Sequence, residues 1–264
     1  MTPPASVEPK DPVPVAGAEG IQHVAVVIPA HNEEQHLEDA LGAVRVAADR
    51  VRGEWPGVGV QIVLVLDSCT DSSAAVAAAV AGEDPRCVVL PLSFRSVGKS
   101  RQAGVRAALK NATEPGGVGE VAPTVSMRHV WVANTDADSC VPDNWLVRQL
   151  ELAAGGADAV LGSVEPDAHG MHHQLLARWH ARHVPTENHP HVYGANLGVR
   201  ASSYVAAGGF PGVDFDEDRG LVDRLRSSGA RLVATGTARV TTSGRTAGRA
   251  PRGFAAYLLA LAAP

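Results

Sequence analysis

Short apolar runs alternate with segments of helical periodicity along this chain, and that alternation restricts the fold more than any other feature. Residues 23–29 (HVAVVIP) and 61–67 (QIVLVLD) are rich in β-branched residues and lead into polar ones, as expected of buried strands followed by loops. The segment between them, residues 33–51, has apolar residues at helical spacing: Leu37, Leu41, Val44 and Ala48. With Asn32 as a candidate N-cap, this segment predicts a helix that joins two parallel strands.

The same alternation continues toward the end of the chain. Further strands are expected at residues 87–91, 129–134, 159–162, 196–200, 232–234 and 239–242. Further helices are expected at residues 71–81, 99–110, 144–154, 171–183 and 220–228, and loops at residues 111–123 and 184–191. This order predicts an α/β fold with a single doubly wound, mostly parallel mixed sheet, whose ligand-binding loops follow the carboxyl ends of the strands.

The composition fits one large globular domain and narrows its partners. The 264 residues are 45% hydrophobic and 19% charged, which is enough apolar material for a sizeable core. A net charge of -5 supplies no basic surface for a phosphate backbone, so nucleic acid is not expected as a partner. Three scattered cysteines, Cys69, Cys87 and Cys140, suit a reducing compartment, and we expect a cytoplasmic protein.

The two ends of the chain differ from its middle. Residues 1–20 are rich in proline and acidic residues, which predicts a disordered leader ahead of a folded domain at residues 21–250. Residues 251–264 form an apolar tail, expected to be a terminal helix docked on the core. No apolar run approaches the roughly 18 residues of a membrane span. Peripheral membrane contact of the tail stays an open alternative, although the tail lacks the basic face that favours binding to a membrane surface.

Two acidic residues, Asp136 and Asp138, follow an apolar run in the sequence VWVANTDADS. The alternation of a strand would place both carboxylates on one side, where they could share a hard divalent cation such as Mn²⁺ or Mg²⁺. Asp67 and the PAHNEE loop at residues 29–34 also follow predicted strands, so three polar clusters are expected to converge on one crevice. A polar strand-to-loop turn without a ligand is the alternative.

Six segments in order resemble the family 2 nucleotide-sugar glycosyltransferases. They are VVIPAHNEE (26–34), VLDSCTDSS (65–73), GKSRQAGVRAAL (98–109), NTDADS (134–139), GANLGVRASSYVAAGGF (194–210) and EDRGLVDRLRSSG (217–229). The resemblance covers residues 24–249 and implies the A-type glycosyltransferase fold. It further implies a nucleotide-binding half at residues 21–139 and an acceptor half at residues 140–250.

The resemblance also implies a nucleotide site in the loops after the first two strands. It assigns the base and ribose of the donor to Pro29, His31, Asn32 and Glu33. Asp67 would accept a hydrogen bond from the edge of the base, and Ser68 stands where family members usually have a second acid. We expect uracil, with guanine as the second choice, so that the donor is a UDP-sugar or a GDP-sugar.

Basic residues at a predicted helix start are expected to meet the diphosphate. Lys99 and Arg101 follow Gly98, and their charges together with free helix N–H groups suit an anion. Solvated surface charges are the alternative, and the upstream glycine of a P-loop is missing here. The resemblance implies that Asp138 binds the metal directly and that Asp136 lies toward the ribose or the cation. The cation would stabilise the leaving diphosphate.

A second basic group follows the last predicted strand. Arg245, Arg249 and Arg252 are its members, and Arg245 completes a Ser-x-Arg sequence. Similar ends meet phosphate in some family members, and a basic solvated tail is the alternative.

The resemblance places the acceptor beside two later motifs. Gly194, Asn196 and Gly209 correspond to an acceptor-side loop, where missing side chains permit close approach to a sugar. Glu217 and Asp218 match the acidic pair of inverting members, with Asp218 as the general base for the acceptor hydroxyl. Turn chemistry and a capping carboxylate are the alternatives.

Three other functions remain open. Seven histidines lie within residues 169–191, and in a retaining A-type enzyme one of them, His189 or His191, would complete the metal site. A nucleotidyltransferase would need a glycine-rich loop after the first strand, where this chain has PAHNEE. The third alternative is a nucleotide-binding protein without turnover. The sequence identifies neither the sugar nor the acceptor.

Overall fold

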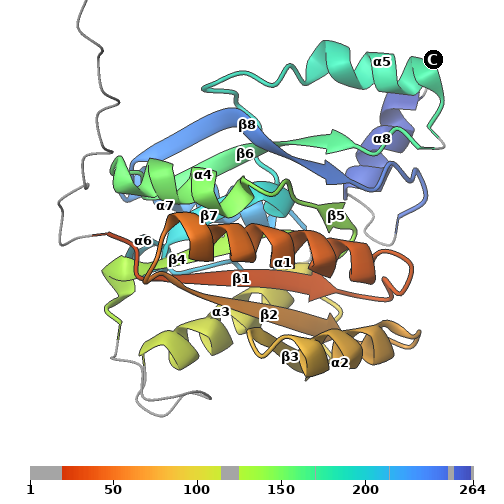
Figure 1. The fold of residues 1–264 in the computed structure, drawn as a ribbon. Coiled ribbons are helices and arrows are strands. Elements are labelled where there is room, and N and C mark those ends of the chain that lie inside the picture. The colour runs from red at the N-terminus through yellow and green to blue at the C-terminus, as the bar shows by residue number, and fades with distance from the viewer. Residues whose placement is uncertain (1–19, 114–124, 170, 214, 249–252, 263–264) are drawn as a thin grey trace, which may run out of the picture.

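The strands form a mixed sheet that runs through the centre of the molecule (Figure 1). The structure is a computed structural model that describes residues 20–113, 125–169, 171–213, 215–248 and 253–262. Residues 1–19 of the predicted leader, most of the predicted loop at residues 111–123, and both Arg249 and Arg252 lie outside the described residues. The described strands follow the order β3-β2-β1-β4-β7-β6-β8-β5.

The strand bounds are β1 His23–Ala30, β2 Gly59–Asp67, β3 Cys87–Leu92, β4 Val130–Asn134, β5 Ser139–Cys140, β6 Ala159–Pro166, β7 Leu197–Arg200 and β8 Leu232–Thr242. Strands β3, β2, β1 and β4 pair in parallel, as do β6 and β8. Strand β7 is antiparallel to both β4 and β6, and β5 is antiparallel to β8. The predicted mostly parallel mixed sheet is confirmed.

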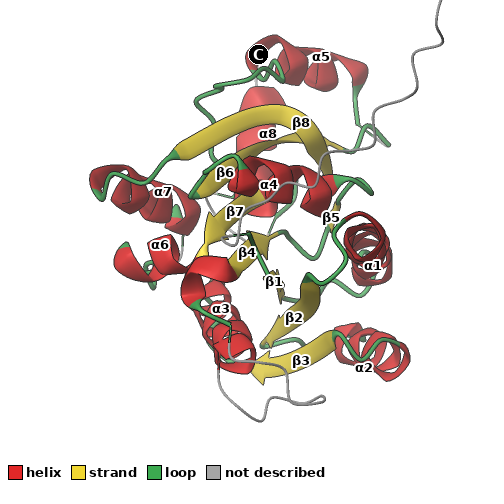
Figure 2. Ribbon diagram, turned by 60° about the vertical axis from the view of Figure 1, so that its left-hand side comes forward, coloured by secondary structure: helices red, strands yellow, loops and turns green. Residues whose placement is uncertain are grey.

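Helices cover both faces of this sheet (Figure 2). Their bounds are α1 Leu37–Glu54, α2 Ser73–Glu83, α3 Val97–Thr113, α4 Trp145–Ala154, α5 His173–Arg182, α6 Ala201–Ala206, α7 Glu217–Ser227 and α8 Phe254–Ala262. One hydrophobic core joins α1, α2 and α4 to the sheet, and a second joins α3, α6 and α7 to its other face. The doubly wound prediction is therefore confirmed.

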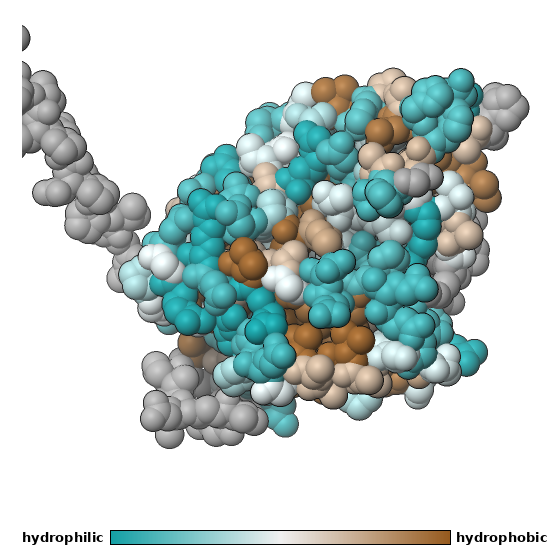
Figure 3. All heavy atoms as spheres, turned by 45° about the vertical axis from the view of Figure 1, so that its right-hand side comes forward, coloured by the Kyte–Doolittle hydropathy of each residue, from teal (hydrophilic) through white to brown (hydrophobic). Residues whose placement is uncertain are grey.

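Helices α5 and α8 lie together next to the part of the sheet that contains β8 (Figure 1). Leu258 and Leu261 of α8 are buried, so the apolar tail packs on the fold as predicted. Among the described helices, none is both long and apolar enough to cross a bilayer. Figure 3 brings the carboxyl ends of the central strands forward, and hydrophilic residues dominate the face that it shows.

The structure differs from the sequence prediction at several elements. The strands predicted at residues 232–234 and 239–242 are one strand, β8, with a bulge between the pairs Gly162–Thr235 and Val164–Val240. Ala238 in this bulge has a φ of 52°. The prediction of two separate strands was therefore wrong, because backbone pairing with β6 resumes after the bulge. Strand β5 and helix α6 were not predicted.

Asn32 does not cap the first helix. Helix α1 begins at Leu37, and Asn32 lies five residues earlier with a φ of 55°. Its Oδ1 instead accepts a hydrogen bond of 2.7 Å from the N–H of Thr70. The capping prediction was wrong because this side chain ties together the loops that follow β1 and β2.

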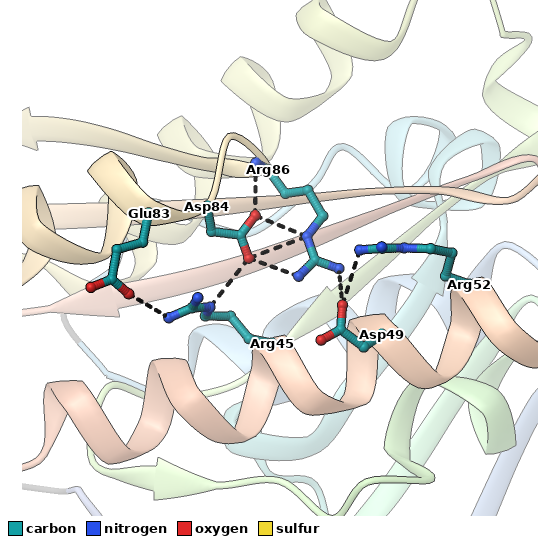
Figure 4. Close-up of polar contacts among 6 residues, drawn as sticks. All are labelled: Arg45, Asp49, Arg52, Glu83, Asp84 and Arg86. Atoms are coloured by element: carbon teal, nitrogen blue, oxygen red, sulfur yellow. Dashed lines mark hydrogen bonds and ion pairs between the residues drawn. The ribbon is translucent and has the colours of Figure 1, made fainter.

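A network of ion pairs joins α1 to the turn between α2 and β3 (Figure 4). The guanidinium of Arg86 forms a two-pronged pair with the buried carboxylate of Asp84, at distances of 2.7 to 3.2 Å. Arg45 reaches Asp84 at 3.3 Å, and Asp49 pairs with Arg86 at 2.9 Å. These pairs connect α1 to the start of β3, and none of them involves a residue of the candidate site.

Candidate active site

Polar residues from distant parts of the chain meet at the carboxyl ends of β1 and β4. The turn after β4 supplies Asp136 and Asp138, and the loop after β1 supplies Glu33. Two arginines connect these carboxylates to the rest of the fold. Arg101 comes from α3, and Arg245 follows β8.

The two carboxylates of the Asp-x-Asp motif point to different partners. Asp136 Oδ1 pairs with Arg101, whereas Asp138 Oδ2 pairs with Arg245 Nη2 at 2.9 Å. Strand β4 already ends at Asn134, so the motif lies in a turn. The argument that strand alternation sets both carboxylates on one side was therefore wrong.

Asp138 is the less exposed of the two acids. Its burial, followed by the negative charge of Asp136, raises its pKa to about 6, and Arg245 acts in the opposite direction. Two neighbouring carboxylates whose negative charges repel each other are suited to bind a hard cation such as Mn²⁺ or Mg²⁺. The described residues contain no group of three His, Cys, Asp or Glu side chains arranged to hold a metal ion. A cation at Asp138 would therefore take its remaining ligands from water or a substrate.

Arg101 lies inside the protein and connects two elements. Its Nε donates to Glu217 Oε1 at 3.2 Å, and its other end pairs with Asp136. The side chain is 2% exposed and its charge is already paired, and the predicted contact of Arg101 with a diphosphate stays a prediction. A Cβ atom added to Gly194 would lie 2.6 Å from Arg101 Nη2. Gly194 is thus needed for the packing of this arginine, and its predicted place beside the acceptor stays a prediction.

Asp218 lies in the first turn of α7, next to Glu217. Burial raises the pKa of Asp218, while hydrogen bonds from the backbone N–H groups of Arg219 and Gly194 lower it. Burial also raises the pKa of Glu217, and Arg101 opposes that shift. A raised pKa is what a carboxylate general base requires, but the catalytic role of Asp218 stays a prediction.

The loop after β1 is held by contacts within the protein. His31 Nδ1 lies 2.6 Å from the backbone oxygen of Asp67, and Pro29 is half-buried in β1. Both carboxylate oxygens of Glu33 accept hydrogen bonds from Arg245, at 2.7 and 2.9 Å. The predicted contacts of this loop, including Asn32, with a nucleoside stay predictions.

Asp67 anchors the loop that leads into α3. It is buried, and its two oxygens accept hydrogen bonds from the N–H groups of Phe94, Arg95 and Ser96 at 2.7 to 3.0 Å. The Ser100 hydroxyl adds a fourth at 2.8 Å. These donors account for the carboxylate within the protein, and the predicted hydrogen bond from the base edge stays a prediction.

Asn196 is also a structural residue. Its Oδ1 accepts from Trp145 Nε1 at 2.9 Å, and its Nδ2 donates to the backbone oxygens of Ser163 and Ala238. The side chain is buried and packs against Gly162, where an added Cβ would lie 2.2 Å away. The predicted acceptor-side role of Asn196 stays a prediction beside this structural role.

Gly209 and Lys99 lie outside this cluster of carboxylates. Gly209 has a φ of 69°, and a Cβ added there would lie 2.9 Å from the Tyr204 hydroxyl oxygen. Turn geometry and packing thus favour a glycine at this position, and its predicted acceptor-side role stays a prediction. Lys99 is exposed, and its contact with a diphosphate stays a prediction.

The histidines predicted to complete a metal site have other partners. His189 Nε2 lies 3.2 Å from the backbone oxygen of Thr235, and His191 stacks among rings that include His183 and Tyr193. Within the described residues, no hydrogen bond or ion pair joins His189 or His191 to Asp138. His36 is the histidine whose charge acts on the Asp138 carboxyl. Sequence reasoning missed it because nothing local marks the start of α1 as lying near the Asp-x-Asp turn.

A cleft of about 640 Å³ opens beside this cluster. His36 and Arg245 line it together with residues of α5, Arg178 among them. The His-rich segment therefore contributes to a space next to the carboxylates, although no sequence pattern indicated which of its residues would do so.

Comparison with known proteins gives one match to a family model, described as glycosyl transferase family 2, over residues 25–206. A curated relative is undecaprenyl-phosphate 4-deoxy-4-formamido-L-arabinose transferase of Pectobacterium carotovorum subsp. carotovorum (strain PC1). It is 29% identical over 140 residues, and the match covers 53% of this chain and 36% of the relative. The chain therefore corresponds to only a part of that relative.

Two solved structures share the fold. S. aureus TarS 1-349 in complex with UDP has a TM-score of 0.57 at 15% identity, and the match covers 84% of this chain and 60% of that one. The mannosyltransferase PcManGT from Pyrobaculum calidifontis, in complex with GDP-Man and Mn²⁺, has a TM-score of 0.60 at 20% identity. That match covers 94% of this chain and 63% of the other. This chain spans less than two thirds of either structure, and at these identities the likeness shows the fold.

Proposed function

Because this chain belongs to glycosyl transferase family 2, we propose that it transfers a sugar from a nucleoside diphosphate sugar to an acceptor hydroxyl. One observation supports this proposal above the others. Arg101 pairs with Asp136 of the Asp-x-Asp turn and with Glu217 at the start of α7. The predicted donor-side and acceptor-side acids are thereby brought to one place, as a direct transfer between two bound substrates requires.

The donor is proposed to be a UDP-sugar, with a GDP-sugar as the alternative. TarS binds UDP and PcManGT binds GDP-Man with Mn²⁺, and both share the fold of this chain. Asp138, with Asp136 nearby, would hold Mn²⁺ or Mg²⁺, and such a cation stabilises negative charge on a leaving diphosphate. The lipid phosphate in the name of the curated relative makes lipid-linked acceptors one class to screen.

We propose inversion of configuration with Asp218 as the general base. The acceptor oxygen would attack the anomeric carbon, the bond from that carbon to the diphosphate oxygen would break, and the hydroxyl proton would pass to Asp218. The raised pKa of Asp218, caused by burial, supports this role. Glu217 would act through its pair with Arg101, which positions the start of α7.

Calorimetric titration with UDP and GDP, each with and without Mn²⁺, tests the donor assignment. We expect one diphosphate to bind tightly and only with the metal, and Asp138→Asn to abolish this binding. Asp223→Asn is the matched control, because Asp223 lies on α7 in an exposed pair with Arg226. Failure of both nucleotides to bind would refute the proposed donor class.

Product analysis tests the mechanism. NMR of the first product formed from the donor would give the anomeric configuration, and retention would contradict the proposed base. Donor binding without transfer to any acceptor class would instead favour a nucleotide-binding protein without turnover.

A further inference from the structure

A guanidinium occupies the carboxylate that is the best candidate for a cation ligand. Arg245 Nη2 lies 2.9 Å from Asp138 Oδ2. The same side chain donates to both oxygens of Glu33, at 2.9 and 2.7 Å. Arg245 therefore has one two-pronged pair with Glu33 and one additional contact with Asp138.

The backbone around Arg245 is fixed close to Asp138. The N–H of Ser243 donates to the backbone oxygen of Asp138 at 3.1 Å. A Cβ added to Gly244 would lie 2.3 Å from the backbone oxygen of Asp167 and 2.6 Å from Met171 Sδ. This close packing needs a glycine, and it sets the position from which the Arg245 side chain reaches the two acids.

A divalent cation and Arg245 cannot share this oxygen. A Mn²⁺ or Mg²⁺ ion binds a carboxylate oxygen at about 2.0–2.2 Å, and Arg245 Nη2 lies 2.9 Å from the same Oδ2. Repulsion between the two positive centres at this separation, in a half-buried site, would be strong. Binding of the cation at Oδ2 thus requires that Arg245 gives up this oxygen of Asp138.

We propose that Arg245 competes with the divalent cation for the carboxylate of Asp138, and that Glu33 holds Arg245 in place for this competition. This inference rests on the proposed function for the identity of the cation ligand. The pair with Glu33 can persist while the contact with Asp138 breaks, because Glu33 is held by both Nη1 and Nη2, whereas Asp138 contacts only Nη2, which has two N–H donors. Arg245 therefore lowers the affinity for free metal and links cation binding to binding of the donor, whose diphosphate offers the released guanidinium a new partner.

The test is a titration of purified protein with Mn²⁺ in the absence of nucleotide, followed by the electron paramagnetic resonance signal of free Mn²⁺. Removal of a competing charge-assisted pair should tighten binding by about tenfold in Arg245→Gln. Arg245→Lys keeps the charge but loses the fork, and its affinity should lie between the two. Circular dichroism and thermal unfolding establish that each variant is folded.

Arg86→Gln is the matched control. Arg86 also forms a two-pronged pair with a buried aspartate, Asp84, far from the Asp-x-Asp turn (Figure 4). Its Mn²⁺ affinity should equal that of the wild type, because a general effect of losing an arginine would appear in both variants.

Unchanged or weaker Mn²⁺ binding in folded Arg245→Gln would overturn the inference, and so would Mn²⁺ binding in neither protein. A second titration in saturating UDP or GDP should bring the affinities of the wild type and Arg245→Gln closer together. If neither nucleotide binds, the proposed function fails, whereas the nucleotide-free titration still decides the competition.

Discussion

Replacement of Arg101 by methionine should destabilise the fold mainly because it leaves the buried carboxylate of Glu217 without its positive partner. Arg101 is 2% exposed, and its partners Glu217 and Asp136 are 8% and 35% exposed. Water can reach Asp136 when its partner is removed, but it cannot easily reach Glu217. Removal of one member of a buried pair typically costs about 3–5 kcal/mol, because a buried charge stays uncompensated.

Urea denaturation of the wild type, Arg101→Met, Glu217→Gln and the double variant forms a cycle that isolates this term. The double variant should recover most of the loss, since it contains no buried charge at this pair. Arg226→Met is the control. Its partner is Asp223 in an exposed pair on α7, so the cost should stay below about 1 kcal/mol.

The loss in Arg101→Met should also depend on pH with a definite sign. Burial raises the pKa of Glu217 in the folded protein, and Arg101 opposes this, so the variant should have a still higher folded pKa. Between the unfolded and folded pKa values the folded state binds more protons, and the free energy of unfolding falls as pH rises. The difference from the wild type should therefore be largest at neutral pH and shrink in acid. A loss below about 1 kcal/mol at neutral pH, or one that grows in acid, would refute this account.

Three further predictions concern separate parts of the molecule. Asp218→Asn should lower the rate of sugar transfer by roughly 10²–10⁴-fold and leave nucleotide affinity unchanged, as measured by turnover assays and calorimetry. Normal turnover in this variant would show that Asp218 is not the general base. Arg86 lowers the pKa of Asp84 to about 2, so the stability that Asp84 contributes is present above its unfolded pKa of about 4 and lost as pH falls through 2. Urea midpoints of the wild type and Asp84→Asn should therefore converge in acid, and a constant difference would contradict this. Asn196→Ala leaves Trp145 Nε1 without its acceptor and should cost about 2 kcal/mol or more by urea denaturation; a change within about 0.5 kcal/mol would argue against a structural role.

Most of the fold could be predicted from the sequence because its strands and helices are locally distinct. The apolar run at residues 61–67 and the helical spacing after Leu37 each depend only on neighbours in the chain. The bulge in β8 depends instead on pairing with β6, whose residues lie about seventy positions earlier. The two-residue strand β5 is too short to have a period.

The structure brings several of the predicted site residues to one edge of the sheet, while their roles in binding and catalysis stay predictions. Acidic and amide side chains at strand ends do lie at the carboxyl edge of the sheet, as the topology requires. Asp67 and Asn196 nevertheless satisfy backbone and indole groups inside the fold. A loop sequence does not reveal which distant donor a buried side chain will meet, and the pairing of Arg245 with Glu33 spans 212 positions.

The charges around the Asp-x-Asp turn argue that donor and cation bind together. Each arginine neutralises one acid of the motif and brings in a second acid of its own, so that four carboxylates face two guanidiniums: Glu33, Asp136, Asp138 and Glu217 against Arg101 and Arg245. With all six of these side chains ionised, they carry two net negative charges, which one divalent cation would balance. A nucleoside diphosphate adds further negative charge, so without a cation it would be repelled from the cluster. We therefore expect the nucleotide to bind only together with a divalent cation, and this expectation requires no third protein ligand for the metal.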